Sequence, residues 1–96
     1  GKGQTADVTT NTVADITNST INGNVYGGGN DGAVGGFTDI NIQGTNIGGS
    51  VYAAGQGKDA EVTGYTLLEM SNSYVVNDVY GGGNEAGQTL CLCNFQ

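Results

Sequence analysis

The chain has 96 residues, 36% hydrophobic and none of them tryptophan, which suffices for one small domain but not for a broad globular core. Nineteen glycines in the absence of proline exclude collagen, because the triple helix needs proline as well as regularly spaced glycine. Two basic and nine acidic residues give a net charge of −7, the wrong sign for binding phosphates, so neither nucleic acid nor an anionic membrane is expected as a partner. No segment approaches the roughly 20 apolar residues of a membrane span, so no membrane insertion is expected.

A six-residue word recurs along the chain. It reads VYGGGN, VYAAGQ and VYGGGN at residues 25–30, 51–56 and 79–84. The spacings are 26 and 28 residues, and the copies align without a gap when they begin at Val8, Val34 and Val62. Repeats of this length indicate structural units that stack on one another. We predict coils at about 8–33, 34–61 and 62–89, and a partial fourth strand at 90–96 that begins with Leu90.

Each copy begins with a run in which apolar or small residues alternate with other residues. In the second copy this run extends from Val34 to Ile42, and the apolar positions then jump to Ile47 and Val51. Alternation with a period of two predicts a half-buried strand, and the longer jumps predict corners. We expect one narrow core, lined by Ile16, Ile21, Val25, Val34, Ile40, Ile42, Ile47, Val51, Val62, Leu68, Met70, Val75 and Val79.

Two columns of the alignment contain only glycine and asparagine. One column holds Asn18, Gly44 and Asn72, and the other holds Gly23, Gly49 and Asn77. Glycine and asparagine are the residues that best tolerate a positive φ. Both columns therefore predict a left-handed bend, and the two bends together with the variable loop give each coil three sides.

Glycine and β-branched residues dominate the repeats, and no apolar stripe of helical spacing occurs, so helices are not expected. The sequence predicts an all-β fold, a parallel β-solenoid (β-helix) of about three coils with a repeat of 26–28 residues. Equivalent side chains then stack into ladders along the coils. The expected ladders are those of Thr12, Thr38 and Thr66, of Tyr26, Tyr52 and Tyr80, and of Asn30, Gln56 and Asn84.

The word Val-Tyr-Gly-Gly-Gly-Asn resembles the glycine-rich repeats of long bacterial surface or adhesin-like proteins of β-solenoid type. The resemblance covers about residues 1–90, and the second copy departs from it at Ala53, Ala54 and Gln56. It implies an extracellular or cell-surface stalk or scaffold without an assigned chemistry. The tail at 91–96 lies outside the resemblance.

The chain offers little material for catalysis, and we expect no enzymatic activity. It contains neither histidine nor arginine, and its serines have no adjacent base in the sequence. Gly27, Gly29 and Gly32 spell the glycine pattern of dinucleotide-binding loops, but the residues that follow do not begin the helix that this motif requires. The carboxylates of Asp39 and its neighbours Asp15 and Glu69 are interpreted as solubilising an outward face.

No cofactor is expected, but weak calcium binding is a hypothesis for two pairs of acidic residues. Asp31 and Glu85 follow the asparagine of the repeated word, as acidic residues do in calcium-binding solenoids. Asp15 and Glu69 flank Asn41 in an outward column and are a second such place. For Cys91 and Cys93, a metal pair, an intermolecular disulfide and two inert thiols all remain open, with inert thiols preferred.

Two function classes fit these patterns. The first is a structural scaffold that stacks head-to-tail with copies of itself into an extracellular fibre or stalk. The chain opens in a loop that precedes a coil and ends in a strand that opens one, and neither end carries the polar cap that a solenoid needs. The second is a cell-surface adhesin, excised from a longer solenoid, whose tyrosine-rich loop edge contacts a glycan or a protein.

Overall fold

The computed structural model describes residues 7–83 and 88–95, and these residues form strands without any helix. No segment among them is therefore a helix of the length and apolarity that crossing a membrane requires. The strands, in chain order, are β1 (Thr12–Thr17), β2 (Thr20–Ile21), β3 (Val25–Tyr26), β4 (Thr38–Gln43), β5 (Asn46–Ile47), β6 (Val51–Tyr52), β7 (Val62–Ser71), β8 (Tyr74–Val75), β9 (Val79–Tyr80) and β10 (Gln88–Phe95).

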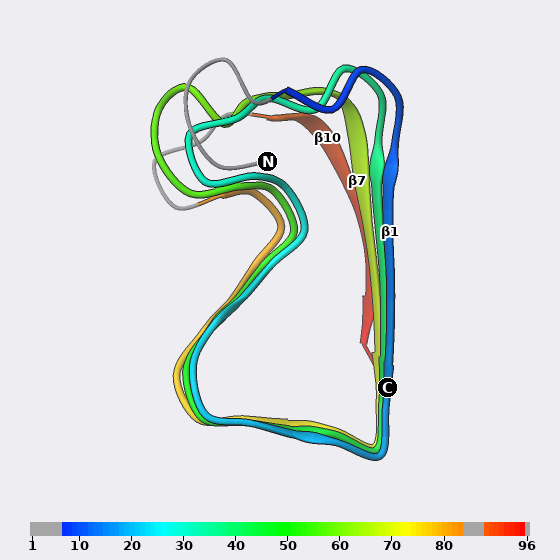
Figure 1. The fold of residues 1–96 in the computed structure, drawn as a ribbon. Helices are drawn as coiled ribbons and strands as arrows, with labels where there is room; N and C mark the ends of the chain where they lie inside the picture. The colour runs from blue at the N-terminus through cyan, green and yellow to red at the C-terminus, as the bar shows by residue number, and fades with distance from the viewer. Residues whose placement is uncertain (1–6, 84–87, 96) are drawn as a thin grey trace.

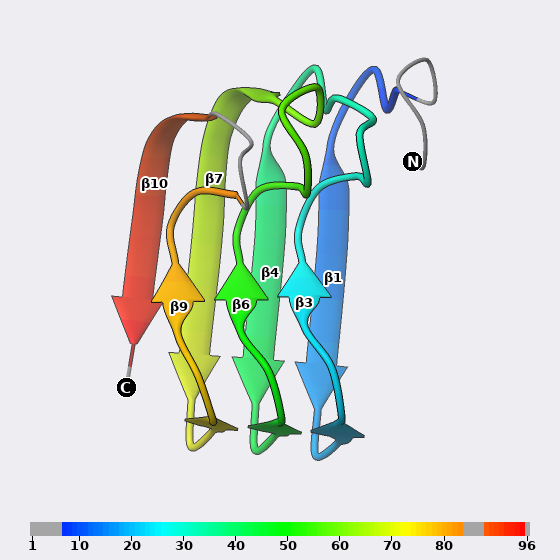
Figure 2. The same cartoon turned by 90° about the vertical axis from the view of Figure 1, so that its left-hand side faces the viewer.

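Within the described part of the chain, the strands form three parallel sheets. Their orders are β1-β4-β7-β10, β2-β5-β8 and β3-β6-β9. Figure 1 looks along the stack, where equivalent segments lie over one another, and Figure 2 shows the strands side by side. Thr12 pairs with Thr38 and Thr38 with Thr66, which are register steps of 26 and 28 residues. The arrangement is compatible with a solenoid-like fold.

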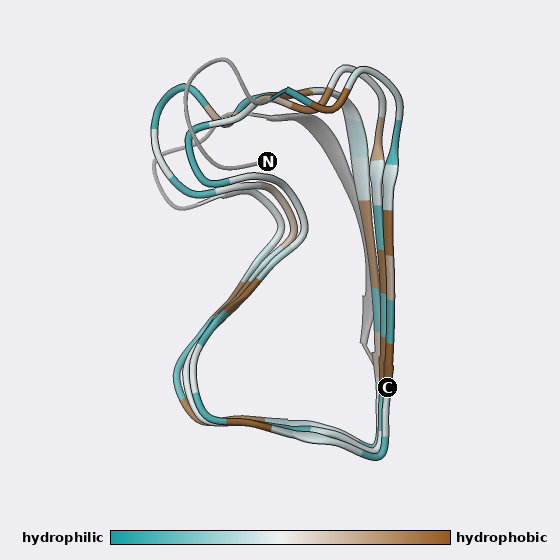
Figure 3. Ribbon diagram, viewed as in Figure 1, coloured by the Kyte–Doolittle hydropathy of each residue, from teal (hydrophilic) through white to brown (hydrophobic). Residues whose placement is uncertain are grey.

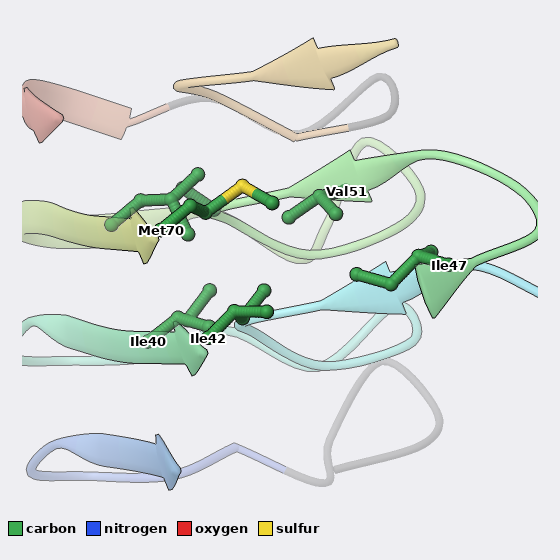
Figure 4. Packing of buried hydrophobic residues seen from close by; sticks show 7 residues of the cluster. Ile40, Ile42, Ile47, Val51 and Met70 are labelled. Carbon is green, nitrogen blue, oxygen red and sulfur yellow. The ribbon is translucent and has the colours of Figure 1, made fainter. Parts of the chain in front are cut away.

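The core runs inside these turns, and the hydrophobic segments recur at corresponding places of successive turns (Figure 3). In the middle turn Ile40, Ile42, Ile47 and Val51 are at most 1% exposed. Side chains from β4, β5, β6 and β7 meet there (Figure 4). Every residue expected in the core is buried or packs half-buried against buried neighbours.

The expectation of one narrow core is wrong, because the buried residues that the structure describes form two clusters. The larger contains Ile40 and Ala53, and the smaller contains Val34, Ala54 and Val62. The backbone of the repeated word separates them, since Thr38 Oγ1 donates a hydrogen bond of 2.6 Å to the Ala53 carbonyl across the turn.

The first of the two predicted bends is confirmed. Asn18, Gly44 and Asn72 have φ values of 48°, 58° and 51°. Each lies directly after the long strand of its turn, where the chain changes direction. A left-handed residue at that point is favourable only for glycine and, among the other residues, chiefly for asparagine and aspartate.

The second predicted bend is wrong, because Gly23, Gly49 and Asn77 do not have positive φ. Gly49 is needed for a different reason. A Cβ at this position would lie 2.8 Å from the Gly23 carbonyl oxygen of the neighbouring turn and would overlap the Asn24 side chain. Positive φ occurs instead at Asp31 (65°) and Gly57 (93°), in the loop after the repeated word.

The expectation that a fourth copy begins at Leu90 is also wrong. β10 starts earlier, and Gln88 rather than Leu90 pairs with Val62. A register shift between Gln88 and Leu90 then pairs Leu90 with Tyr65 and Phe95 with Met70. This register places Cys91, Cys93 and Phe95 in the columns that are buried in β7, and Leu90 and Leu92 in the half-buried columns of Tyr65 and Leu67.

Candidate functional site

The column of Thr12, Thr38 and Thr66 forms a repeated cross-connection inside the turns. Each hydroxyl donates to a backbone carbonyl 15 residues further along the same turn, at distances of 2.6, 2.6 and 2.8 Å. The acceptors are the carbonyls of Gly27, Ala53 and Gly81. The strand register stacks the three threonines on one another as expected, and each hydroxyl also links the two sides of its own turn.

The tyrosine column stacks face to face. The ring centroids of Tyr26 and Tyr52 are 4.9 Å apart and those of Tyr52 and Tyr80 are 4.7 Å apart, with interplanar angles of 4° and 5°. A second aromatic pair, Phe37 on Tyr65, is stacked at 4.9 Å. This pair does not form a column over all three copies, because the first copy has Asn11 at the equivalent position. Stacking occupies the ring faces between the turns. The outer faces of Tyr26 and Tyr80 have no ring stacked on them among the described residues.

The third expected ladder is present only as backbone pairing where it is described. Asn30 and Gln56 form an isolated parallel bridge. The Gln56 N–H donates to the Gly29 carbonyl and the Asp31 N–H donates to the Gln56 carbonyl, each at 2.8 Å. Asn84 lies outside the described residues.

Side-chain oxygens replace the missing strand partners at the corners, a role that was not expected from the sequence. Thr45 Oγ1 accepts a hydrogen bond from the Ser19 N–H (3.3 Å), and Ser73 Oγ accepts one from the Thr45 N–H (3.1 Å). Each hydroxyl also donates to the carbonyl two residues earlier, as Ser19 does to Thr17 at 2.7 Å. The hydroxyls of Thr45 and Ser73 therefore satisfy backbone N–H groups where strand pairing stops.

A second corner column works in the opposite direction along the stack. Asn24 Oδ1 accepts from the Ser50 N–H at 2.7 Å, and Ser50 Oγ accepts from the Asp78 N–H at 3.2 Å. Asp78 in turn accepts a hydrogen bond of 3.1 Å from the Tyr80 hydroxyl. The pKa of Tyr80 is raised above the ordinary value of 10.0. The main cause is the hydrogen bond to the Asp78 carboxylate, and the second is the negative charge of that carboxylate.

We expect Asp78→Ala to lower the pKa of Tyr80, because the neutral hydroxyl loses its charged acceptor. The hydrogen bond from Tyr80 to Asp78 contributes to the stability of the fold below the ordinary pKa of tyrosine. This contribution disappears as the pH rises through the raised pKa of Tyr80. An alkaline titration followed by phenolate absorbance measures the change, with Tyr80→Phe identifying the transition and Asp39→Ala as the control. An unchanged midpoint in Asp78→Ala would contradict the assignment.

The acidic residues named in the calcium hypothesis do not gather into one cluster in the part of the chain that the structure describes. Asn41 pairs with Asp15 on one side and with Glu69 on the other, so the two carboxylates lie in one outward column but two strands apart. No group of three or more metal-ligating side chains occurs among the described residues. Asp31 lies beside Gly57, and Glu85 lies outside the described residues. Cys91 and Cys93 take the register positions of Thr66 and Leu68.

The two ends of the stack are the surfaces where the repeated pattern is incomplete. We call the face of β1, β2 and β3 the first end and the face of β8, β9 and β10 the last end. At the first end Ala14, Ile16, Ile21 and Val25 are half-buried, whereas their equivalents in the middle turn are buried. At the last end Leu68 and Met70 are buried in β7, which β10 covers, but Val75 and Val79 of β8 and β9 are half-buried.

The edge of the first end also presents backbone groups. The Thr12 and Asn18 N–H groups donate to carbonyls on the β4 side, at 3.0 and 2.9 Å. Residues of a parallel strand direct their backbone groups alternately to the two neighbours. The N–H groups of Val13, Asp15 and Thr17 therefore face away from β4, toward the edge that no described strand covers.

Comparison with protein-family models, with curated proteins and with solved structures finds no match to this chain. The geometry of the two ends is therefore the main support for a function.

Proposed function

We propose that the chain is a non-catalytic β-solenoid scaffold with coils at about 8–33, 34–61 and 62–89, and that copies stack head-to-tail into an extracellular fibre or stalk. The single observation that carries the proposal is the difference in burial between the middle turn and the ends. Ile47 and Val51 are fully buried between two turns, whereas Ile21 and Val25 at the first end have a described neighbouring strand on one side only.

Adding a turn at either end would bury this apolar surface and pair the open edge. Burial stabilises association by roughly 25 cal/mol for each Å² of apolar surface. Unprotected parallel edges pair readily with other strands, and the chain has no proline to block them. The extracellular or surface location is supported by the resemblance of the repeated word to bacterial surface proteins. The charge of −7 opposes stacking, so salt should promote it by screening.

The adhesin alternative receives no comparable support. Sugars stack on the faces of aromatic rings. In the column Tyr26, Tyr52 and Tyr80 the faces between turns are occupied by the neighbouring ring, and Tyr80 is exposed by 42% at the end of the column. Tyrosine stacking therefore favours continuation of the column over a side-on binding platform.

The proposal is tested by a proline at the open edge. Asp15→Pro removes an N–H that faces away from β4, so it leaves the hydrogen bonds between β1 and β4 intact. Asp15→Ala is the matched control, because it removes the same carboxylate and keeps the N–H. We expect the proline to raise the concentration for half-association roughly tenfold relative to alanine, since an interchain backbone hydrogen bond is lost.

Sedimentation velocity over a range of protein and salt concentrations measures this difference. The far-ultraviolet circular dichroism of both variants should match that of the unaltered chain. Equal association of the proline and alanine variants would contradict pairing through β1, and a strict monomer at high protein concentration and high salt would contradict the stacking function.

A further inference from the structure

The described strands leave a step at the last end of the stack. The sheet of β1, β4 and β7 has β10 as a fourth strand, whereas the described sheets of β8 and β9 each end at their third strand. A second copy that placed its β1 on β10 would hold its β2 and β3 two strand spacings above β8 and β9, about 10 Å away. Val75, Val79 and Tyr80 would then stay uncovered.

We infer that the partner surface is the combined edge of β7, β8 and β9, that its occupant is the first turn of a second copy, and that β10 competes with β1 of that copy for the edge of β7. The inference rests on the proposed stacking function and specifies its joint. In this role β10 is a removable cap, because it occupies the place in the largest sheet that the incoming strand would take.

The apolar columns continue across this joint. At the register step that the chain itself uses between turns, Ile16 of the second copy would lie on Met70, Ile21 on Val75 and Val25 on Val79. The equivalent internal contacts, made by Ile42, Ile47 and Val51 with the same residues, are fully buried on the middle-turn side. The joint would therefore reproduce an interface that already exists twice within the chain.

The polar groups also continue with the correct direction. Ser73 Oγ accepts from Thr45 on its inner side, and the next acceptor in that column for the Ser73 N–H is the Ser19 hydroxyl of the second copy. In the opposite direction, Ser50 accepts the N–H of Asp78, so the Asp78 carboxylate is placed to accept the Asn24 N–H of the second copy. Tyr26 of that copy would cover the outer face of Tyr80.

One contact across the joint is repulsive and makes the arrangement identifiable. Asp15, Asn41 and Glu69 form one column, so Asp15 of the second copy would stand directly beside Glu69. Like charges opposite one another on neighbouring strands are destabilising. With β10 retained, Asn94 takes that place beside Glu69, and the two carboxylates are a further strand apart. The charge at residue 69 therefore distinguishes the two joints.

The first test loosens β10 in the full chain. The register between β10 and β7 places the Leu92 N–H on the side that faces β7, so Leu92→Pro removes a group needed for this pairing. Leu92→Ala keeps the N–H and is the matched control. We expect Leu92→Pro to lower the concentration for half-association by about tenfold or more relative to Leu92→Ala, because the competing strand is weakened.

The second test changes only the charge at residue 69 and does not depend on the proline variant folding. Glu69→Lys should associate about two- to fivefold more readily than Glu69→Gln, because the lysine gains an ion pair with Asp15 of the second copy. Combining Glu69→Lys with Asp15→Lys should abolish this gain, because two lysines then face one another.

These outcomes separate the joint from the stacking function itself. The role of β10 is overturned if folded Leu92→Pro and Leu92→Ala associate equally, or if Glu69→Lys and Glu69→Gln associate equally. If association is nevertheless weakened by Asp15→Pro, the stacking function stands. Absence of association in every variant, including the unaltered chain at high salt, overturns the stacking function as well.

Discussion

Ile42→Ala should lower the free energy of unfolding by about 3 to 4 kcal/mol, the range for a large-to-small change at a fully buried position. Ile42 is 0% exposed and packs between β1 and β7, with neighbours on both sides of its turn. Deleting its side chain would leave a cavity that the flanking turns cannot close, because their backbones are fixed to one another by strand pairing. A loss of this size is a large share of the stability of a small domain.

The matched control is Ile16→Ala, the same substitution one turn earlier in the same column. Ile16 is half-buried at the first end, so its loss should cost only about 1 to 2 kcal/mol in dilute solution. Urea unfolding at low protein concentration and low salt measures both values. Equal losses at the two positions would contradict the difference in burial between the middle turn and the first end.

Gly55→Ala should be strongly destabilising, with a loss of about 3 kcal/mol or more in the free energy of unfolding from overpacking. Gly55 is buried, and a Cβ there would overlap the Gly29 carbonyl oxygen and lie 2.7 Å from the Ala60 side chain. The backbone of the neighbouring turn cannot retreat without breaking the bridge at Asn30 and Gln56.

Gly23→Ala provides the control for this prediction. A Cβ at Gly23 meets nothing within 4 Å, and its φ is not positive, so alanine should be neutral or stabilise by up to about 1 kcal/mol through the unfolded chain. Thermal and urea unfolding of the two variants compare them directly. A stable Gly55→Ala protein would contradict the close approach of successive turns at the repeated word.

Much of the fold could be predicted because one column of equivalent residues fixes the register between the strands. When Tyr26, Tyr52 and Tyr80 recur at fixed spacing, parallel pairing places them on one another, and the alternation within each copy assigns the inward residues. The stacked rings and the buried middle turn follow from those two patterns alone.

The remaining features depend on distances between neighbouring turns and on backbone angles, which an alignment of the copies does not show. Glycine at residue 49 is selected by a neighbouring backbone and glycine at residue 44 by a positive φ, yet both columns consist of glycine and asparagine. The corner role of Thr45 and Ser73 was not predicted, because the column contains both threonine and serine. The two residue types differ in the alignment, but their hydroxyls accept hydrogen bonds in the same way. The register of β10 depends on a shift near Gln88 that interrupts the repeat.

Electron microscopy of the purified chain tests the central claim most directly. The unaltered protein and Leu92→Pro should be imaged by negative stain over several protein concentrations at high salt. Stacking through the open ends predicts unbranched filaments whose width is that of a single turn, and these should appear at lower concentration for Leu92→Pro. Only dispersed single particles of both proteins, at every concentration, would contradict the claim that the ends of this chain join.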